Sequence, residues 1–223
     1  MTFARFAAGI FALLLGLASA TARAQAPAAG GPYQLVDPPQ KTETGNKIEV
    51  IEFFSYACPH CNEFEPHLQA WLKKKPKDMA YRMVPMVFRQ EWLPFAKLYY
   101  TLEAMDLLDK HHTKVYEAIY KDQVALQDPA ILKKWVERQG IDAKKFFEIY
   151  DSFGVDAKTQ RSMTLARAYG VTFTPAMVVN GKYRTGPSMT PGPDGMPSYQ
   201  RFFQVLDQLV AMARGKPAAK KKS

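Results

Sequence analysis

The chain contains two cysteines, and they stand three positions apart as Cys58-Pro59-His60-Cys61. A disulfide between them would close a very short loop, and short loops give little chain-entropy stabilisation, so a structural disulfide explains the pair poorly. A cysteine with a lowered pKa is instead a nucleophile that exchanges disulfides. We therefore interpret the pair as a redox centre, with a structural disulfide and a metal site as the alternatives.

The pair is expected at the start of a helix. Helical spacing relates the apolar residues that follow, namely Cys61, Phe64, Leu68, Trp71 and Leu72. Pro59 suits the first turn, where its missing N–H needs no partner. Unpaired backbone N–H groups and the helix dipole favour an anion there, so they lower the pKa of Cys58, and a protonated His60 would lower it further. Cys58 is therefore predicted as the nucleophile and Cys61 as the resolving thiol.

The same electrostatics indicate the direction of exchange. A stabilised Cys58 thiolate favours the reduced protein and makes its disulfide more oxidising. Each unit of pKa depression is worth about 1.4 kcal/mol, or roughly 30 mV for a two-electron couple, so three units would give roughly 90 mV. We predict that the chain donates its Cys58–Cys61 disulfide and needs no other cofactor.

A metal site is a weaker interpretation of the same residues. Structural zinc takes four Cys or His ligands, and only His60 and His67 lie close to the cysteines in sequence. His67 comes six residues after Cys61, and its convergence with His60 on one ion is awkward. The pair His111-His112 has no companion ligands and is expected on a solvated helix surface. We predict no bound metal.

Strands flank the predicted first helix. Residues Ile48 to Phe54 are rich in β-branched and aromatic side chains, and a second strand is expected from Met79 to Met86. Strand, helix and strand in this order predict a parallel crossover unit. Further on, Ala176 to Val179 and Lys182 to Thr185 flank Asn180-Gly181, which favours a type I′ hairpin.

The middle of the chain has helical periodicity, and residues 95 to 169 are predicted to form a helical insertion. Gly140 is a plausible helix stop, Asp142 can cap the next helix, and the last helix is expected from about Asp156 to Tyr169. After the hairpin, residues 186 to 197 are rich in Pro and Gly and predict a loop. Ser198 can cap a final helix.

The N-terminus reads as an export signal. Arg5 supplies a positive start, Phe6 to Ala18 is nearly all apolar, and cleavage is predicted after Ala24, with Ala20 as the alternative. A retained membrane anchor needs about 20 apolar residues, which is more than this run offers. We expect an exported protein in which residues 1–24 are removed, residues 25–45 form an exposed lead-in and residues 215–223 form a basic tail.

The net charge of +9 does not by itself indicate a nucleic-acid partner. Lysines crowd the C-terminal tail and the end of the predicted first helix, where such runs are usually solvated. No interleaving of aromatic and basic residues and no known binding motif accompanies the charge. We therefore predict no nucleic-acid binding.

Two segments resemble the DsbA family of periplasmic disulfide oxidoreductases. The first is Glu52-Phe53-Phe54-Ser55-Tyr56-Ala57-Cys58-Pro59-His60-Cys61. The second is Thr172-Phe173-Thr174-Pro175-Ala176-Met177-Val178-Val179-Asn180-Gly181-Lys182-Tyr183, which looks like the family's cis-proline strand and hairpin. The resemblance implies an α/β thioredoxin fold, built from residues 46–94 and 170–214, with residues 95–169 as the inserted helical domain.

The resemblance also implies roles for three residues and two kinds of partner. Pro175 would be cis and face the disulfide, and the backbone of Thr174 would pair with an extended substrate segment. Glu52 would be a buried acid that accepts or relays the Cys61 proton; the alternative is a strand acid that points to solvent. The implied substrates are reduced, unfolded exported proteins, and the implied reoxidant is a quinone-linked membrane protein resembling DsbB.

Other functions remain open on the sequence. Within the same chemistry, the chain could be an isomerase or a reductase, although isomerases of this fold carry an added dimerisation domain for which there is no room before Lys47. A chaperone-like binder of unfolded chains with idle cysteines is a further alternative, and it would keep its function without Cys58 and Cys61.

Overall fold

The computed structural model describes residues 31–215 of the chain. The predicted signal peptide lies outside the described residues, as do residues 25–30 of the lead-in and residues 216–223 of the tail. None of the helices between residues 31 and 215 is long and apolar enough to cross a membrane.

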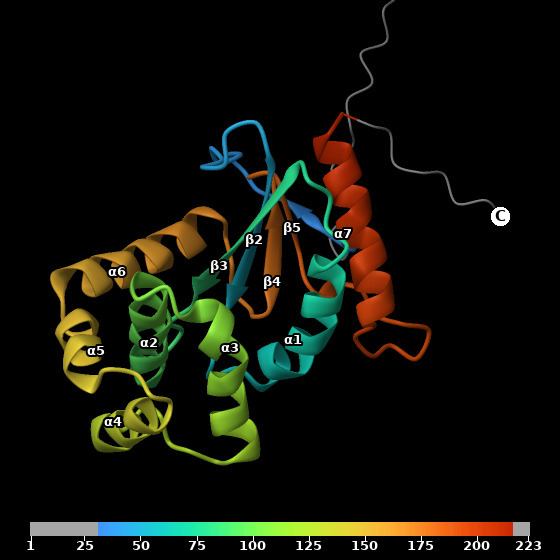
Figure 1. The fold of residues 1–223 in the computed structure, drawn as a ribbon. Coiled ribbons are helices and arrows are strands. Elements are labelled where there is room, and N and C mark those ends of the chain that lie inside the picture. The colour runs from blue at the N-terminus through green and yellow to red at the C-terminus, as the bar shows by residue number, and fades with distance from the viewer. Residues whose placement is uncertain (1–30, 216–223) are drawn as a thin grey trace, which may run out of the picture.

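A five-stranded mixed sheet in the order β1-β5-β4-β2-β3 forms the centre of the fold (Figure 1). Its strands are β1 (Gln34–Leu35), β2 (Ile48–Phe54), β3 (Met79–Pro85), β4 (Ala176–Val179) and β5 (Tyr183–Thr185). β2 and β3 are parallel and are joined through helix α1 (Pro59–Leu72), so the predicted crossover unit is confirmed. β4 runs antiparallel to both β2 and β5.

Both faces of β2 are buried, since its residues alternate between two cores. Val50 packs in the core beneath α1 (Pro59–Leu72) and α7 (Tyr199–Ala213), together with Phe64 and Phe202. Ile51 and Phe53 face the other way, into a core shared with the end of helix α6 (Phe153–Ala168). A strand that is buried on both faces is expected to be mostly apolar along its whole length, as β2 is.

The chain between β3 and β4 is helical and packs around a core that includes Leu98, Trp135 and Phe146 and extends to Phe54 and the two cysteines. The helices are α2 (Leu93–Ala104), α3 (Leu108–Tyr116), α4 (Pro129–Arg138), α5 (Ala143–Tyr150) and α6 (Phe153–Ala168). Short helices complete the described chain: η1 (Gln90–Trp92), the π-helical turn η2 (Glu117–Lys121) and η3 (Pro187–Met189). Figure 1 shows this helical part beside the sheet, at the end towards which β2 and β3 run.

Local sequence signals for caps and turns are confirmed. The side chain of Asp142 accepts a hydrogen bond from Lys145 N and that of Ser198 from Arg201 N, at the starts of α5 and α7. Asn180 and Gly181 have φ angles of 50° and 69°, as the predicted hairpin requires. A Cβ on Gly181 would stand 2.0 Å from the carbonyl oxygen of Gln40, so glycine is also needed for close approach.

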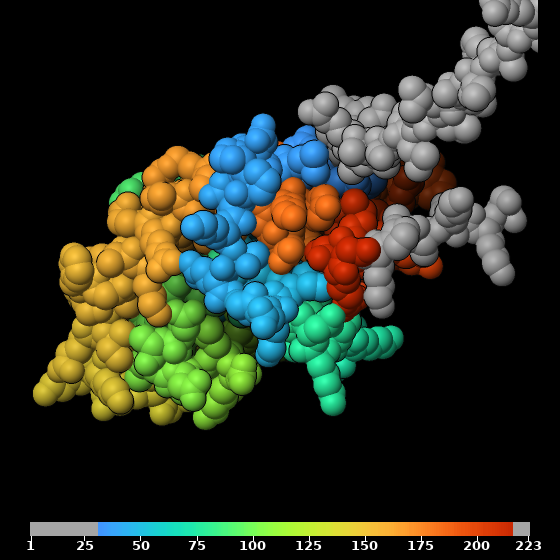
Figure 2. Space-filling model, turned by 90° about the horizontal axis from the view of Figure 1, so that it is seen from above, coloured from blue at the N-terminus to red at the C-terminus, as the bar shows by residue number. Residues whose placement is uncertain are grey.

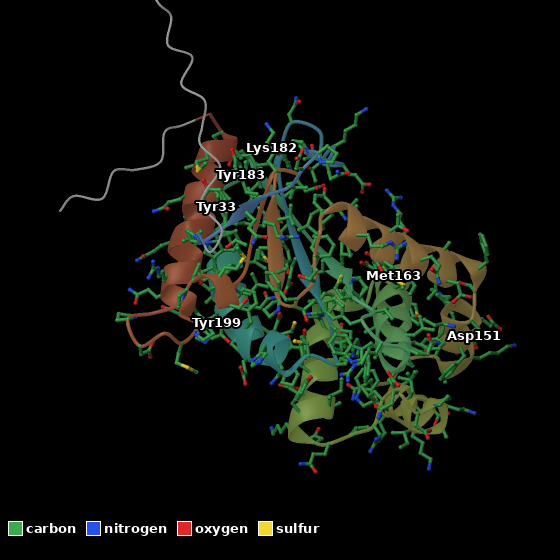
Figure 3. All side chains as sticks on the ribbon, turned by 180° about the vertical axis from the view of Figure 1, so that it is seen from behind. Tyr33, Asp151, Met163, Lys182, Tyr183 and Tyr199 are labelled. Atoms are coloured by element: carbon green, nitrogen blue, oxygen red, sulfur yellow. The ribbon has the colours of Figure 1, made fainter. Side chains whose placement is uncertain are left out.

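The prediction of an exposed lead-in is wrong for Val36 and missed a strand just before it, whereas residues 37–45 are exposed or half-buried. Gln34 and Leu35 form β1, which pairs with β5, and Val36 is buried. Figure 2 shows this N-terminal segment (blue) against the β4–β5 hairpin (orange), and Figure 3 shows Tyr33 beside Tyr183, with ring centroids 5.7 Å apart. Without β1, the outer side of β5 would be an unpaired edge, so the added strand satisfies its backbone groups.

Candidate active site

The turn that follows β2 places Cys58 at the head of α1. The backbone N–H of Cys58 donates to the Ser55 carbonyl oxygen at 3.0 Å, and the Ser55 hydroxyl accepts from Ala57 N at 3.1 Å. Cys58 is the extended N-cap residue, with φ −96° and ψ 113°, and Pro59 occupies the first turn. The predicted helix start is therefore confirmed.

The two cysteines occupy different surroundings although both are thiols in this structure. Cys58 is 5% exposed and Cys61 1% exposed. The pKa of Cys58 is lowered to about 6, chiefly because the Cys61 thiol donates a hydrogen bond to its sulfur; partial burial opposes this, and Thr174 and the backbone N–H groups of Cys61 and His60 add to it. Burial raises the pKa of Cys61, and so does its hydrogen bond to Cys58.

Thr174 and Pro175 face this pair from the start of β4. The Thr174–Pro175 peptide bond is cis, as the family resemblance implied. The Cys58 thiol lies 3.5 Å from the Thr174 carbonyl oxygen, to which it donates. Antiparallel pairing of β2 with β4 brings the two segments together, because the end of β2 meets the beginning of β4. Behind them, a Cβ on Gly186 would stand 2.9 Å from the Pro175 carbonyl oxygen, so the backbone packs closely there.

The imidazole of His60 contacts a residue of its own helix and is exposed. Its Nδ1 lies 3.2 Å from Glu63 Oε2, and both side chains are exposed to solvent. His60 reaches the Cys58 sulfur through its backbone N–H instead. The predicted influence of a protonated His60 on Cys58 stays a prediction.

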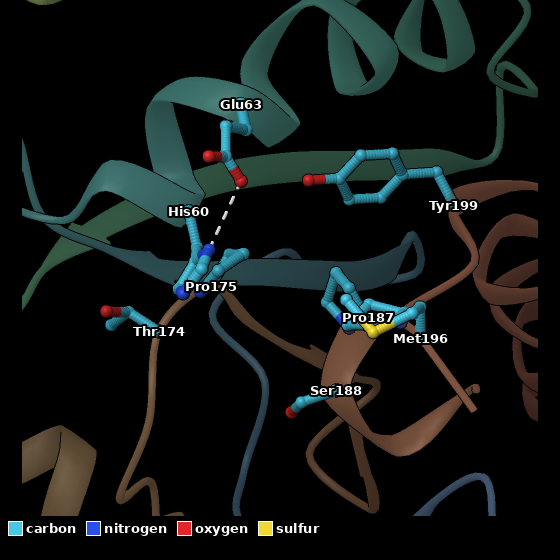
Figure 4. A pocket seen from close by; sticks show the side chains of 9 residues that line it. His60, Glu63, Thr174, Pro175, Pro187, Ser188, Met196 and Tyr199 are labelled. Atoms are coloured by element: carbon cyan, nitrogen blue, oxygen red, sulfur yellow. Dashed lines mark hydrogen bonds and ion pairs between the residues drawn. The ribbon is translucent and has the colours of Figure 1, made fainter. Parts of the chain in front are cut away.

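A pocket of about 300 Å³ opens beside His60, Thr174 and Pro175 (Figure 4). The rest of its lining is supplied by Glu63, Pro187, Ser188, Met196, Pro197 and Tyr199. Most of this lining is apolar, and Met196 is exposed. The loop 186–197, predicted only as a loop, thus forms one wall of a hollow next to the reactive sulfur.

Glu52 lies in the interior beneath the cysteines, and the alternative of a solvent-facing strand acid is wrong. The Tyr81 hydroxyl donates a hydrogen bond to Glu52 Oε2 from the neighbouring strand β3. Burial raises the pKa of Glu52 to about 8, and the nearby Glu65 raises it as well. Glu52 is therefore protonated at neutral pH in the reduced protein, where it can hold a proton near Cys61.

The prediction that His111 and His112 lie on a solvated surface is wrong, since both are buried. His112 Nδ1 lies 2.8 Å from the Tyr56 hydroxyl, and its Nε2 lies 3.5 Å from Glu65 Oε2. α3 presents this side, with Val115 and Tyr116, to the core. Sequence reasoning missed Glu65, although its spacing of four from Cys61 places it on the buried stripe of α1.

His67 does not join the site, and two methionines close to the site segments in sequence lie in the core. Met86 and Met177 are buried rather than lining the pocket. The ring of His67 lies against that of Tyr199, tilted by 33°, with centroids 4.5 Å apart. Within residues 31–215, no group of three or more His, Cys, Asp and Glu side chains is arranged to hold a metal ion.

Comparison with known proteins gives one family throughout. The model of the DSBA-like thioredoxin domain matches residues 84–204. A thiol:disulfide interchange protein DsbA of Burkholderia cepacia is 39% identical over 207 residues, which cover 92% of this chain and 95% of that protein. Another from Bordetella parapertussis is 40% identical over 200 residues, covering 89% and 93%.

Solved structures agree. The chain is similar to the crystal structure of Pseudomonas aeruginosa DsbA with a TM-score of 0.76 and 33% identity, over 83% of this chain and 94% of that one. It is similar to the oxidoreductase DsbA from Xylella fastidiosa with a TM-score of 0.75 and 29% identity, over 86% of this chain and 100% of that one.

Proposed function

Because this chain belongs to the family of DSBA-like thioredoxin domains and is a thiol:disulfide oxidoreductase, we propose that it acts as an oxidant that donates a Cys58–Cys61 disulfide to reduced, unfolded proteins. The observation that carries the direction is the contrast between the two sulfurs. The pKa of Cys58 is lowered to about 6, whereas that of Cys61 is raised. A stable Cys58 thiolate favours the reduced protein and so favours donation of the disulfide.

The proposed reaction has two exchange steps. A substrate thiolate attacks Cys58 Sγ, the Cys58–Cys61 bond breaks, and Cys61 leaves as a thiolate that takes up a proton. A second substrate thiolate then attacks the substrate sulfur of this mixed disulfide, and Cys58 leaves as a thiolate. The substrate has lost two electrons and the protein has gained them. The hydrogen bonds to Cys58 stabilise the leaving group of the second step.

The residues around the cysteines have roles in this proposal. Glu52 exchanges a proton with Cys61, which is supported by their mutual electrostatic influence and by the burial of both. The backbone of Thr174 pairs with an extended substrate segment, supported by its carbonyl oxygen lying 3.5 Å from Cys58 Sγ. Pro175 keeps this backbone in place at the mouth of the apolar pocket.

We further propose that the protein is exported and works in the periplasm. Its apolar N-terminal run after Arg5 and the small residues before position 25 support this. Disulfides persist in oxidising compartments of that kind. Each turnover leaves a reduced protein, so an oxidant must restore the disulfide. We assign that role to a quinone-linked membrane protein resembling DsbB.

The function is tested by following disulfide formation in a reduced, unfolded test protein. The oxidised wild type is expected to be consumed in proportion to the disulfides formed, and Cys58→Ser is expected to transfer none while keeping the native circular dichroism spectrum. Full activity in Cys58→Ser would rule out the mechanism. A benefit to folding that survives in the Cys58→Ala, Cys61→Ala double variant would indicate a binder of unfolded chains instead. An equilibrium with glutathione that leaves the protein oxidised would indicate a reductase.

A further inference from the structure

His112 and Glu65 form a buried pair that the exchange reaction described above does not use. The imidazole Nε2 lies 3.5 Å from Glu65 Oε2, and the two side chains are 7% and 5% exposed. Nε2 makes no hydrogen bond at this distance, but it lies within reach of an ion pair. The other carboxylate oxygen accepts a hydrogen bond from Gln69 Nε2 at 2.9 Å.

The groups that contact His112 come from four elements, and Glu65 on α1 is the one that carries a charge. Phe54 at the end of β2, Tyr56 in the following turn and Tyr116 on α3 surround the imidazole with rings. Burial raises the pKa of Tyr56 and of Tyr116 well above the usual range, so both hydroxyls stay neutral. His112 and Glu65 therefore depend mainly on each other for charge compensation.

A carboxylate in such surroundings is costly without a cation or a proton. One proton shared by the pair makes it neutral, whether the proton resides on His112 with Glu65 ionised or on Glu65 with His112 neutral. Without the imidazole, Glu65 must either bind a proton itself or stand as an uncompensated anion in the interior. Which of the two happens depends on pH.

Glu65 connects this pair to the redox centre. Its charge acts on Glu52, and Glu52 in turn acts on Cys61. Cys58 and Glu52 also influence each other electrostatically. Negative charge at Glu65 consequently opposes a carboxylate at Glu52, just as negative charge at Glu52 opposes a thiolate at Cys61.

We propose that His112 and Glu65 hold one proton between them, and that His112 is a positioning residue which limits the negative charge facing Glu52 and the cysteines. The proposal rests on the function proposed above and adds a residue from the helical insertion to it. It assigns α3 an electrostatic role in the redox centre.

The test compares the equilibrium between the Cys58–Cys61 couple and glutathione in His112→Gln and in the wild type, at pH 6 and pH 8. Gln keeps a polar group for Tyr56 but cannot carry the proton. At pH 8 the variant is expected to be less oxidising by about threefold to tenfold, in line with a pKa change of a fraction of a unit to one unit at Cys58. The change is expected to be smaller at pH 6, because a lower pH favours a proton on a buried carboxylate that has lost its partner.

Two further variants separate charge from packing. His111→Gln is the matched control, because His111 is equally buried, adjacent in sequence and lacks a hydrogen-bond partner for either ring nitrogen within residues 31–215; it should leave the equilibrium unchanged at both pH values. Adding Glu65→Gln to His112→Gln removes the anion as well and should restore the wild-type equilibrium within about twofold.

The proposal is overturned if His111→Gln and His112→Gln shift the equilibrium equally, if the shift at pH 6 matches that at pH 8, or if the double variant shows no recovery. If His112→Gln does not fold, Glu65→Gln alone serves. Because a pair that shares one proton is already neutral, removing the carboxylate should leave the equilibrium within about twofold of the wild type at pH 8. A couple that becomes more oxidising by about threefold or more would show that Glu65 is an uncompensated anion in the wild type, and it would overturn the proposal. All comparisons are made against the wild-type couple, so a wild type that proves to be a reductant refutes the proposed function without deciding this one.

Discussion

Two His–Glu pairs flank the first turns of α1, and they differ mainly in their access to water. His60 and Glu63 lie 3.2 Å apart on the outside, with side chains 76% and 58% exposed. His112 and Glu65 lie 3.5 Å apart on the inside, 7% and 5% exposed. Exposed pairs are screened and contribute little, whereas buried charges act strongly on one another. The same two residue types therefore have little electrostatic effect on the outer side of the helix. On the inner side they can change the ionisation of neighbouring groups.

The cysteines repeat this contrast between the outer and the inner side. Cys58 lies next to the carbonyl oxygen of Thr174, a residue that lines the pocket, while Cys61 lies in the interior near Glu52. One sulfur is stabilised as an anion and the other as a thiol. Because their surroundings differ, Cys58 can react with other proteins, whereas Cys61 reacts within the chain.

The largest expected effect comes from replacing one cysteine at a time, which tests the difference between Cys58 and Cys61 directly. With oxidised glutathione, Cys61→Ser is expected to gain one glutathione per chain at Cys58, because no second thiol resolves the mixed disulfide. Cys58→Ser is expected to gain essentially none under native conditions, since Cys61 is buried and its pKa is raised. Intact-mass measurement distinguishes the two. Equal labelling of both variants would contradict the assignment of Cys58 as the accessible nucleophile.

Ionisation of Cys58 gives the next largest effect. Its pKa is lowered from 9.0 to about 6, which is about a thousandfold in the ionisation constant. Alkylation of the reduced native protein should therefore rise through a midpoint near pH 6. Because the folded pKa lies below the unfolded value, the thiolate stabilises the folded reduced protein fully above about pH 9, and this stabilisation is lost as the pH falls towards 6. Unfolded protein in urea serves as the control and should show a midpoint near the ordinary thiol value.

Glu52 tests how the buried side of the site affects ionisation and stability. The pKa of Glu52 is raised from 4.5 to about 8, so between these values the folded protein retains a proton that the unfolded chain releases, and stability falls as the pH rises. Glu52→Gln should abolish this fall and make the reduced protein more stable than the wild type by about 1–3 kcal/mol at pH 8. Urea unfolding at pH 5 and pH 8 measures both.

A neighbouring acid on β2 provides the control for that experiment. Glu49 is buried too, but its Oε1 lies 3.2 Å from Arg82 Nε. Glu49→Gln removes the partner of a partly buried cation and is expected to destabilise the protein at both pH values. Stabilisation by both substitutions would show that loss of charge in general, rather than the surroundings of Glu52, is responsible.

The smallest effect is expected on the outer pair. Glu63→Gln removes the exposed carboxylate beside His60, and the glutathione equilibrium should change by less than about twofold, because water screens the pair. The corresponding loss on the inner side, His112→Gln, should exceed it at pH 8. A larger effect from Glu63→Gln would mean that the charge state of His60 reaches Cys58 despite its exposure.

Features that depend on neighbouring residues in the sequence could be predicted. The strand Ile48–Phe54, the hairpin at Asn180-Gly181 and the caps at Asp142 and Ser198 all follow from local chemistry, and the structure has each of them. Cys58 and Pro175 could be placed because their motifs are distinctive. The α/β thioredoxin fold followed from the family resemblance together with the order of strands and helices.

Features that depend on tertiary packing could not be predicted. β1 has no strand pattern of its own and exists because β5 offers an unpaired edge. His112 stands in the run Asp109-Lys110-His111-His112-Thr113-Lys114, whose polarity indicates a solvated surface. Its burial arises from how α3 packs against Phe54, Tyr56 and α1. Because Glu65 and His112 are 47 positions apart in the sequence, their pairing produces no local sequence pattern from which it could be predicted.

The antiparallel pairing of β2 with β4 divides the reactive centre between two distant stretches of chain. A cut in the connection between η2 and α4, around residues 122–128, would leave both cysteines on one fragment and Thr174 with Pro175 on the other. Neither fragment alone can align Phe53 with Ala176, which is the register that brings the halves together. Disulfide transfer would then report reassembly of the two fragments, so the fold offers a ready point of division for a complementation reporter.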